Sequence, residues 1–260
     1  MKFLTKEDWE SILNRLSLNN KNNSKESRVE KMFYEISQRI KRMLFNGQKQ
    51  RLDFITYGIA MTFFHYYVCF NDIKNMDRIQ VCFACLYMSY KIQFINYPLS
   101  ILKKNYKDYL ENEKIQGTDK KTEVDFIKYE IQLYSQLGYD LEIETPFNFF
   151  YNGIYSQFPF SNSKEGLEKL EKLKCFCFNL INDTYTRPLS IYFHPKIIYL
   201  SCLIFSIKFL EYNEIDINKL ILNENVDLIA ECMENIYQIY SRFIEDSPNK
   251  NNNIINKDNK

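Results

Sequence analysis

Side chains that commonly carry enzyme chemistry are sparse in this chain of 260 residues, which has two histidines and six glycines. His65 lies in an almost uninterrupted apolar run, where we expect a core residue that is hydrogen-bonded within the fold. His194 stands directly before Pro195, a pairing typical of a helix start. The sequence contains no glycine-rich phosphate loop of the GxGxxG or Walker type. It therefore predicts a protein without catalytic residues and without a bound cofactor.

The seven cysteines offer a second possible chemistry, metal binding. Cys82-x-x-Cys85 has the spacing of a zinc knuckle, and Cys175-x-Cys177 is a looser pair. Both pairs lie in apolar segments, where a free cysteine behaves as a small hydrophobic residue. A structural zinc site instead wants a second matching pair in a loop. We expect no metal site and, because no export signal is evident, reduced thiols.

Charge and hydropathy narrow the classes of partner. The chain has 34 basic and 33 acidic residues, a net charge of +1, so no basic face for nucleic acid is evident. The longest uncharged segment, 54–71, barely reaches the length of a membrane span, and it contains His65, two threonines and three tyrosines. We interpret this segment as a buried helix. Neither direct nucleic-acid binding nor membrane association is expected.

Helical periodicity dominates the rest of the chain. The expected helices cover about 28–40, 54–70, 79–92, 122–138, 146 onward, 164–185, 194–211 and 225–245. The helix at 122–138 carries the apolar stripe Val124, Ile127, Ile131 and Tyr134, and it is predicted to end at Gly138. Residues 103–121 are predicted to form a polar loop. Residues 1–27 are interpreted as an N-terminal extension and linker, and 246–260 as a disordered tail.

Two segments 117 residues apart share a pattern of small and charged residues. Cys85-Leu-Tyr-Met-Ser-Tyr-Lys91 aligns with Cys202-Leu-Ile-Phe-Ser-Ile-Lys208, with identical Cys, Leu, Ser and Lys. Small side chains let neighbouring helices approach closely, so we expect each segment to lie at the centre of its own helical bundle. We infer a duplication. The predicted fold is all-α, with two tandem bundles of about five helices each.

This arrangement resembles the cyclin box over about residues 28–245. The segment Ala84 to Lys91 is similar to the third cyclin helix, which ends in a lysine. Tyr129-Glu130, followed by Leu137-Gly-Tyr-Asp-Leu141, is similar to the fifth helix and the segment that leaves it. Four further segments resemble the second box and its start, as found in transcription-type cyclins of the K, L and T groups: Glu142 to Phe150, Phe178 to Asp183, Leu189 to Ile191 and Pro195 to Ile198.

The resemblance implies two tandem cyclin boxes, a first, kinase-binding box at 28–145 and a second at 146–245. It implies a regulatory subunit that forms a heterodimer with a cyclin-dependent protein kinase and activates it allosterically. For a transcription-type cyclin, the expected kinase acts in RNA polymerase II transcription. The expected location is the nucleus, with the cytoplasm as a further one.

By motif position, the resemblance makes Lys91 and Glu130 the polar anchor that faces the kinase. Apolar and aromatic positions around this pair would complete the interface: Ile92, Tyr134, Tyr139 and Leu141. The sequence departs from the family after Lys91, because Gln93 and Phe94 stand where relatives often have two acidic residues.

Two alternatives remain open at this stage. One is a cyclin-fold transcription factor that binds nucleic acid, a class that usually has a basic face and an N-terminal zinc ribbon. The other is a helical scaffold that has no kinase partner. Replacing Lys91 or Glu130 separates these hypotheses, since only the kinase regulator should lose its function while the fold is retained.

Overall fold

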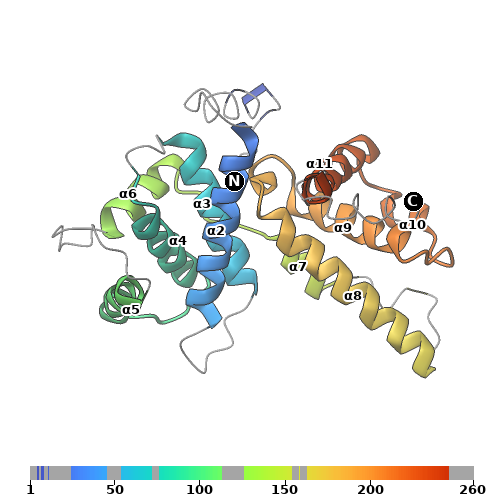
Figure 1. Cartoon of the computed structure of the whole chain (residues 1–260), viewed down its shortest axis with the longest axis horizontal. Coiled ribbons are helices and arrows are strands. Elements are labelled where there is room, and N and C mark those ends of the chain that lie inside the picture. Colours follow the sequence, from blue (N-terminus) through green and yellow to red (C-terminus); the bar gives the residue numbers. More distant parts are fainter. Residues whose placement is uncertain are drawn as a thin grey trace, which may run out of the picture.

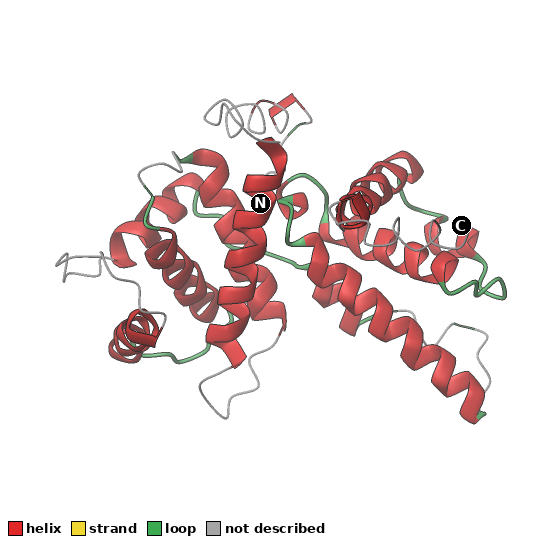
Figure 2. Ribbon diagram, in the orientation of Figure 1, coloured by secondary structure: helices red, strands yellow, loops and turns green. Residues whose placement is uncertain are grey.

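The computed structural model describes residues 5, 7, 8, 11, 25–45, 54–71, 76–112, 126–153, 158 and 163–245. Over these residues, all regular secondary structure is helical (Figure 2). The prediction of an all-α fold is therefore confirmed. Figure 1 shows the helices in two groups, with α2 to α6 on one side and α7 to α11 on the other.

The first group is built around a helix with no polar face. Its members are α2 (Lys25–Phe45), α3 (Phe54–Phe70), α4 (Arg78–Ile92), α5 (Leu99–Asn112) and α6 (Phe126–Gln136). Of the 17 residues of α3, 14 are buried. A helix that is apolar all round is stable only when other elements surround it. Accordingly α3 packs against α2, α4 and α6, and the predicted central helix is confirmed.

The second group repeats this plan around α9. It consists of α7 (Pro146–Tyr151), α8 (Lys164–Thr184), the short 3₁₀ helix η3 (Leu189–Ile191), α9 (Pro195–Phe209), α10 (Ile217–Ile221) and α11 (Val226–Glu245). Eleven of the 15 residues of α9 are buried, and α7, α8, α10, α11 and η3 all pack against it. The sequence predicted α7, α8, α9 and α11, but it gave no indication of α10 or η3.

The helix starts of α4 and α9 are equivalent at the spacing from which the sequence inferred a duplication. Both helices have 15 residues, and their N-cap residues, Asp77 and His194, lie 117 positions apart. Asp77 accepts hydrogen bonds from the backbone N–H groups of Ile79 and Gln80. His194 Nδ1 accepts one from Lys196 N–H at 3.2 Å, which is the helix-start role predicted for it. Each cap satisfies donors that the first helical turn leaves free.

The helix ends match as well. The N–H of Ile95 donates to the carbonyl of Tyr90 at 2.9 Å, and that of Tyr212 donates to the carbonyl of Ile207 at 3.1 Å. Bonds that reach back five residues in this way define the Schellman motif, in which the residue before the donor is left-handed. The two groups therefore place their central helices between equivalent caps.

The prediction of a loop at 103–121 is wrong for its first part, which belongs to α5. Leu102 and Tyr106 repeat at helical spacing and pack with Phe83 and Phe126 in a small core of their own. The lysines and asparagines on the exposed side of α5 hid this period. The remaining part, from 113, lies outside the described residues, as does the proposed helix start at 122–125.

The chain ends were interpreted as an extension with a linker and as a tail. Helix α2 begins at Lys25, inside the predicted linker, because its first turn contains the good helix formers lysine, glutamate and arginine. Most of residues 1–24, and the predicted tail at 246–260, lie outside the described residues.

The two groups meet at α3 through a buried histidine. The side chain of His65 is fully buried, with Nδ1 3.2 Å from Ser190 Oγ and Nε2 3.1 Å from the carbonyl oxygen of Tyr185. A carbonyl only accepts, so Nε2 carries the proton, and neutral Nδ1 accepts from the serine hydroxyl. The ring also lies edge-on to Phe33, with 4.7 Å between the ring centroids. The predicted hydrogen-bonded core histidine is thus confirmed.

We expect His65 to make the stability of the fold depend on pH. Burial lowers the pKa of His65 to about 3, although the hydrogen bond to Tyr185 opposes the shift. In the unfolded chain its pKa is about 6.5, so below that pH the unfolded state takes up a proton that the folded state excludes. The free energy of unfolding should therefore fall by about 2 kcal/mol between pH 7 and pH 5.

Urea denaturation at the two pH values measures this difference. The control is His65→Gln, which should be less stable at both pH values but should lose about 2 kcal/mol less between them. An identical pH dependence in the wild-type and variant proteins would contradict the expectation.

Candidate functional site

The predicted anchor residues form an ion pair between α4 and α6. Lys91, in the last turn of α4, donates from Nζ to Glu130 Oε1 in the middle of α6, at 2.5 Å. The lysine side chain is 42% exposed, whereas the glutamate side chain is only 8% exposed. The carboxylate is therefore held inside, while the ammonium group reaches the surface. An ammonium group has three donors, so donors remain that a partner could use.

The surroundings of Lys91 favour its charged form. Partial burial lowers the pKa of Lys91, but the hydrogen bond and the charge of Glu130 outweigh it, and the net pKa is raised. The ammonium group also lies 4.5 Å from the centroid of the Tyr87 ring, a cation–π geometry. Burial, followed by the charge of Glu130, raises the pKa of Tyr134. At neutral pH this part of the surface thus presents a cation near the phenol group of Tyr134.

The other four predicted residues are divided between the surface and the core. The rings of Tyr134 and Tyr139 are nearly parallel, with centroids 6.4 Å apart, and Tyr139 is 73% exposed. Ile92 and Leu141 are half-buried and pack against the main hydrophobic core. The tyrosines therefore belong to the surface around Lys91, and Ile92 and Leu141 also serve the chain's own packing.

The apolar stripe predicted for α6 is not the one that is buried. Ile127 and Ile131 are 52% and 59% exposed, whereas Phe126, Glu130, Leu133 and Leu137 face the interior. The buried stripe contains an acidic residue, which sequence patterns assign to the solvent side. Glu130 lies inside because Lys91, 39 residues away, satisfies it. A pairing at that separation leaves no periodic signal in the sequence.

The Lys91–Glu130 pair and the exposed side chains on α4, on α6 and just after them form what we call the α4–α6 surface. Phe94 is 96% exposed and follows Lys91 by three positions. The members of this surface are Tyr87, Lys91, Phe94, Ile127, Glu130, Ile131, Tyr134 and Tyr139. Phe94, Ile127 and Ile131 are exposed and stand within three positions of Lys91 or Glu130 in the chain. Exposed apolar side chains around a polar pair are typical of protein-binding surfaces. Sequence reasoning missed Phe94, Ile127 and Ile131.

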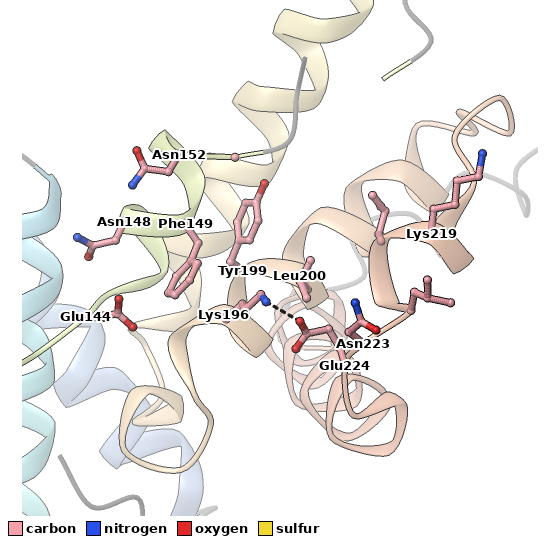
Figure 3. Close-up of a pocket in the computed structure, with 13 residues that line it drawn as sticks. Glu144, Asn148, Phe149, Asn152, Lys196, Tyr199, Leu200, Lys219, Asn223 and Glu224 are labelled. Carbon is pink, nitrogen blue, oxygen red and sulfur yellow. Dashed lines mark ion pairs between the residues drawn. The ribbon is translucent and has the colours of Figure 1, made fainter. Parts of the chain in front are cut away.

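A pocket of about 470 Å³ lies in the second group, among α7, α9, α10 and the turn before α11 (Figure 3). Lys196 and Lys219 line it together with Glu144 and Glu224, so the lining has no excess charge that would attract phosphate. Lys196 Nζ lies 2.5 Å from Glu224 Oε1. None of the predicted site residues lines this pocket. The residues that line the pocket come from distant parts of the chain, and no single sequence motif predicted the pocket.

The described residues also bear on metal and membrane chemistry. Cys82 and Cys85 are buried in the core, and burial raises the pKa of both thiols. Within the described ranges, no three His, Cys, Asp or Glu side chains are grouped so that they could hold a metal ion. Among the helices that the structure describes, none combines the length and the apolar content needed to span a bilayer.

Comparison with known sequences identifies distant relatives. No protein-family model matches the chain. Cyclin-K of Danio rerio is 25% identical over 160 residues, which is 60% of this chain and 36% of that protein. Cyclin-K of Homo sapiens is 24% identical over 160 residues, or 60% of this chain and 26% of that protein. The matched region thus spans only about a third or a quarter of the relatives' length.

Solved structures resemble most of the chain. A chain of the Chaetomium thermophilum CAK complex bound to ATP-γ-S has a TM-score of 0.63 and 14% identity, covering 92% of this chain and 76% of its own length. A chain of the yeast RNA Pol II CTD kinase CTDK-1 complex has a TM-score of 0.62 and 16% identity, with coverages of 94% and 74%. A chain of the yeast TFIIK (Kin28/Ccl1/Tfb3) complex has a TM-score of 0.61 and 15% identity, covering 91% of this chain and 96% of its own length.

This chain has the cyclin fold. Together with the likeness to Cyclin-K, the fold bears out the resemblance to transcription-type cyclins seen in the sequence. The two helix groups correspond to two cyclin boxes, as predicted, and we now call them the first and the second box. The α4–α6 surface belongs to the first.

Within the first box we expect the Lys91–Glu130 pair to stabilise the fold. Lys91→Met should lower the free energy of unfolding by about 1–3 kcal/mol, because it leaves the nearly buried Glu130 carboxylate without its donor. Combining it with Glu130→Gln should cost less than the sum of the two single changes, by about 1 kcal/mol or more. Urea denaturation of the four proteins measures this coupling.

The control is the Lys169–Glu214 pair, whose side chains are 40% and 39% exposed. Water screens such a pair, so its coupling should stay below about 0.5 kcal/mol. Equal coupling energies in the two pairs would contradict the expectation that burial of Glu130 makes the Lys91–Glu130 pair more stabilising.

Proposed function

We propose that this chain is a regulatory subunit that binds a cyclin-dependent protein kinase and activates it allosterically, without catalytic activity of its own. The observation that carries the proposal is the Lys91–Glu130 pair, half-open to solvent and close to exposed apolar side chains, on a cyclin fold. The likeness to Cyclin-K and to chains of kinase complexes supports it.

The polar pair and the apolar side chains would have different tasks at the interface. Lys91 uses a donor on Glu130, and its other donors would bind backbone carbonyls, such as those at the end of a kinase helix. Such a contact fixes the register of two proteins more than it adds affinity. Affinity would come from the large rings and branched side chains of the α4–α6 surface, among them Tyr134 and Tyr139.

Activation follows if this surface binds only one state of the kinase. Catalysis requires that a lysine on the kinase's β3 strand pair with a glutamate on its C helix, which must be turned inward. A rigid partner that binds the inward state shifts the population toward it. Raising the inward state from about 1% to about 99% takes about 5.5 kcal/mol of differential binding, which an interface of ordinary size provides.

The two boxes would divide the work. We assign kinase binding to the first box, 28–145, because it contains the α4–α6 surface. The second box, 146–245, would hold α3 in place from the opposite side, which keeps the first box rigid. Ile92 and Leu141 would serve both the core and the kinase interface, since each packs on the core and retains some exposed surface.

We further propose that the kinase acts in RNA polymerase II transcription and that the complex works in the nucleus. The support is the similarity in fold to chains of the RNA Pol II CTD kinase CTDK-1 and TFIIK complexes, together with the likeness to Cyclin-K. The polymerase tail is the corresponding substrate.

The decisive experiment is affinity capture of this chain from its native lysate, followed by identification of the bound kinase and an assay on a polymerase-tail peptide. We expect one kinase with the wild-type chain and loss of both binding and activity with the Lys91→Ala, Glu130→Ala double variant. The matched control is Lys208→Ala, at the equivalent position of the second box, which should retain binding and activity.

Thermal melting shows whether each variant is folded. Failure of the folded wild-type chain to recover any kinase would overturn the proposal. A role in nucleic-acid binding would instead give retention on DNA or RNA that weakens steeply with salt. Equal kinase recovery by all variants would leave the function standing but remove the anchor role of Lys91 and Glu130.

A further inference from the structure

Phe94 combines two properties that are costly for a folded chain. Its ring is 96% exposed, and its backbone is left-handed, with φ of 54°. Left-handed φ brings the Cβ atom of an L-residue too close to the following carbonyl, so glycine is the usual residue at this point of a helix end. Strained positions that persist in a structure cluster at functional sites.

The second box shows that the fold does not require an aromatic ring here. Glu211 occupies the equivalent position after α9, with φ of 57°. Its N–H donates to the carbonyl of Lys208 at 3.2 Å, just as the N–H of Phe94 donates to the carbonyl of Lys91 at 3.1 Å. The helix end needs a left-handed residue, but a glutamate serves as well. The phenylalanine ring is therefore not explained by the chain's own packing.

The position of the Phe94 ring indicates a role in binding a partner. Phe94 follows the Lys91 anchor by one helical turn, and Tyr139, another exposed ring on a left-handed residue, belongs to the same surface, with φ of 62°. The hydrogen bonds that close α4 fix the backbone of Phe94 before any partner arrives. A backbone held in this way has little freedom left to lose on binding, which favours an interface anchor.

We infer that Phe94 is the specificity-determining anchor of the proposed kinase interface, and that it inserts into an apolar pocket of the kinase. This inference rests on the proposed function. An apolar pocket suits this point, because the exposed ring of Phe94 has a large apolar area to bury and neither Phe94 nor the preceding Gln93 carries a charge. We expect a kinase with a carboxylate at the corresponding position to bind more weakly, because Phe94 has no donor for a carboxylate.

Replacement by glycine separates the role of the ring from that of the fold. Phe94→Gly removes the ring and also relieves the left-handed strain, so the free chain should melt at the same temperature or up to about 4 °C higher. The dissociation constant for the kinase identified by capture, purified and titrated against the chain, should rise at least about 30-fold. The matched control, Glu211→Gly, relieves the same strain in the second box and should leave this constant unchanged.

Each outcome decides the inference. A clearly lower melting temperature for Phe94→Gly would mean that the ring packs within the chain, and a dissociation constant within about threefold of wild type would mean that it does not anchor the kinase. An equal loss of binding in both glycine variants would trace the effect to the helix ends. Any of these results overturns the inference while the proposed function stands, whereas a folded wild-type chain that binds no kinase overturns both.

Discussion

The burial of α3 on every side is the constraint on which the rest of this structure depends. One flank of the helix is covered by α2, α4 and α6, and the other by α7 and η3 of the second box. At Gly58 the approach is so close that a Cβ atom would lie 2.6 Å from Tyr185 Oη and 2.9 Å from Thr145 Cγ2. His65 adds hydrogen bonds across the same boundary. The two boxes therefore share one core and hold each other in place.

This shared core fixes the proposed binding surface. Helix α4 packs along α3, and its last turn is tied to α6 by a carboxylate that is almost buried. A buried charge is tolerated only with a well-placed partner, so the positions of the two helices and the position of the Lys91 ammonium group are set together. The pair that holds α6 against α4 also brings the Lys91 ammonium group to the solvent.

The sequence predicted the elements that depend on local chemistry. The cap at His194 and the stop at Gly138, where φ is 60°, are formed as the residue types indicated. What it missed depends on distant pairings. The exposed polar face of α5 concealed its period, and the buried stripe of α6 includes Glu130, whose partner comes from another helix. The kinase-facing role of the predicted site residues stays a prediction.

Duplication explains how one fold can carry both a framework and a binding surface. The helix ends of α4 and α9 have the same hydrogen bonds, but the residues around them differ. At the last residue of α9, the ring of Phe209 stacks on Phe176 of α8, with centroids 4.7 Å apart, so this helix end is partly covered from within the chain. After α4, Phe94 extends into solvent. Because the backbone is secured by the same bonds in both boxes, the side chains at the two helix ends can differ while the fold stays the same.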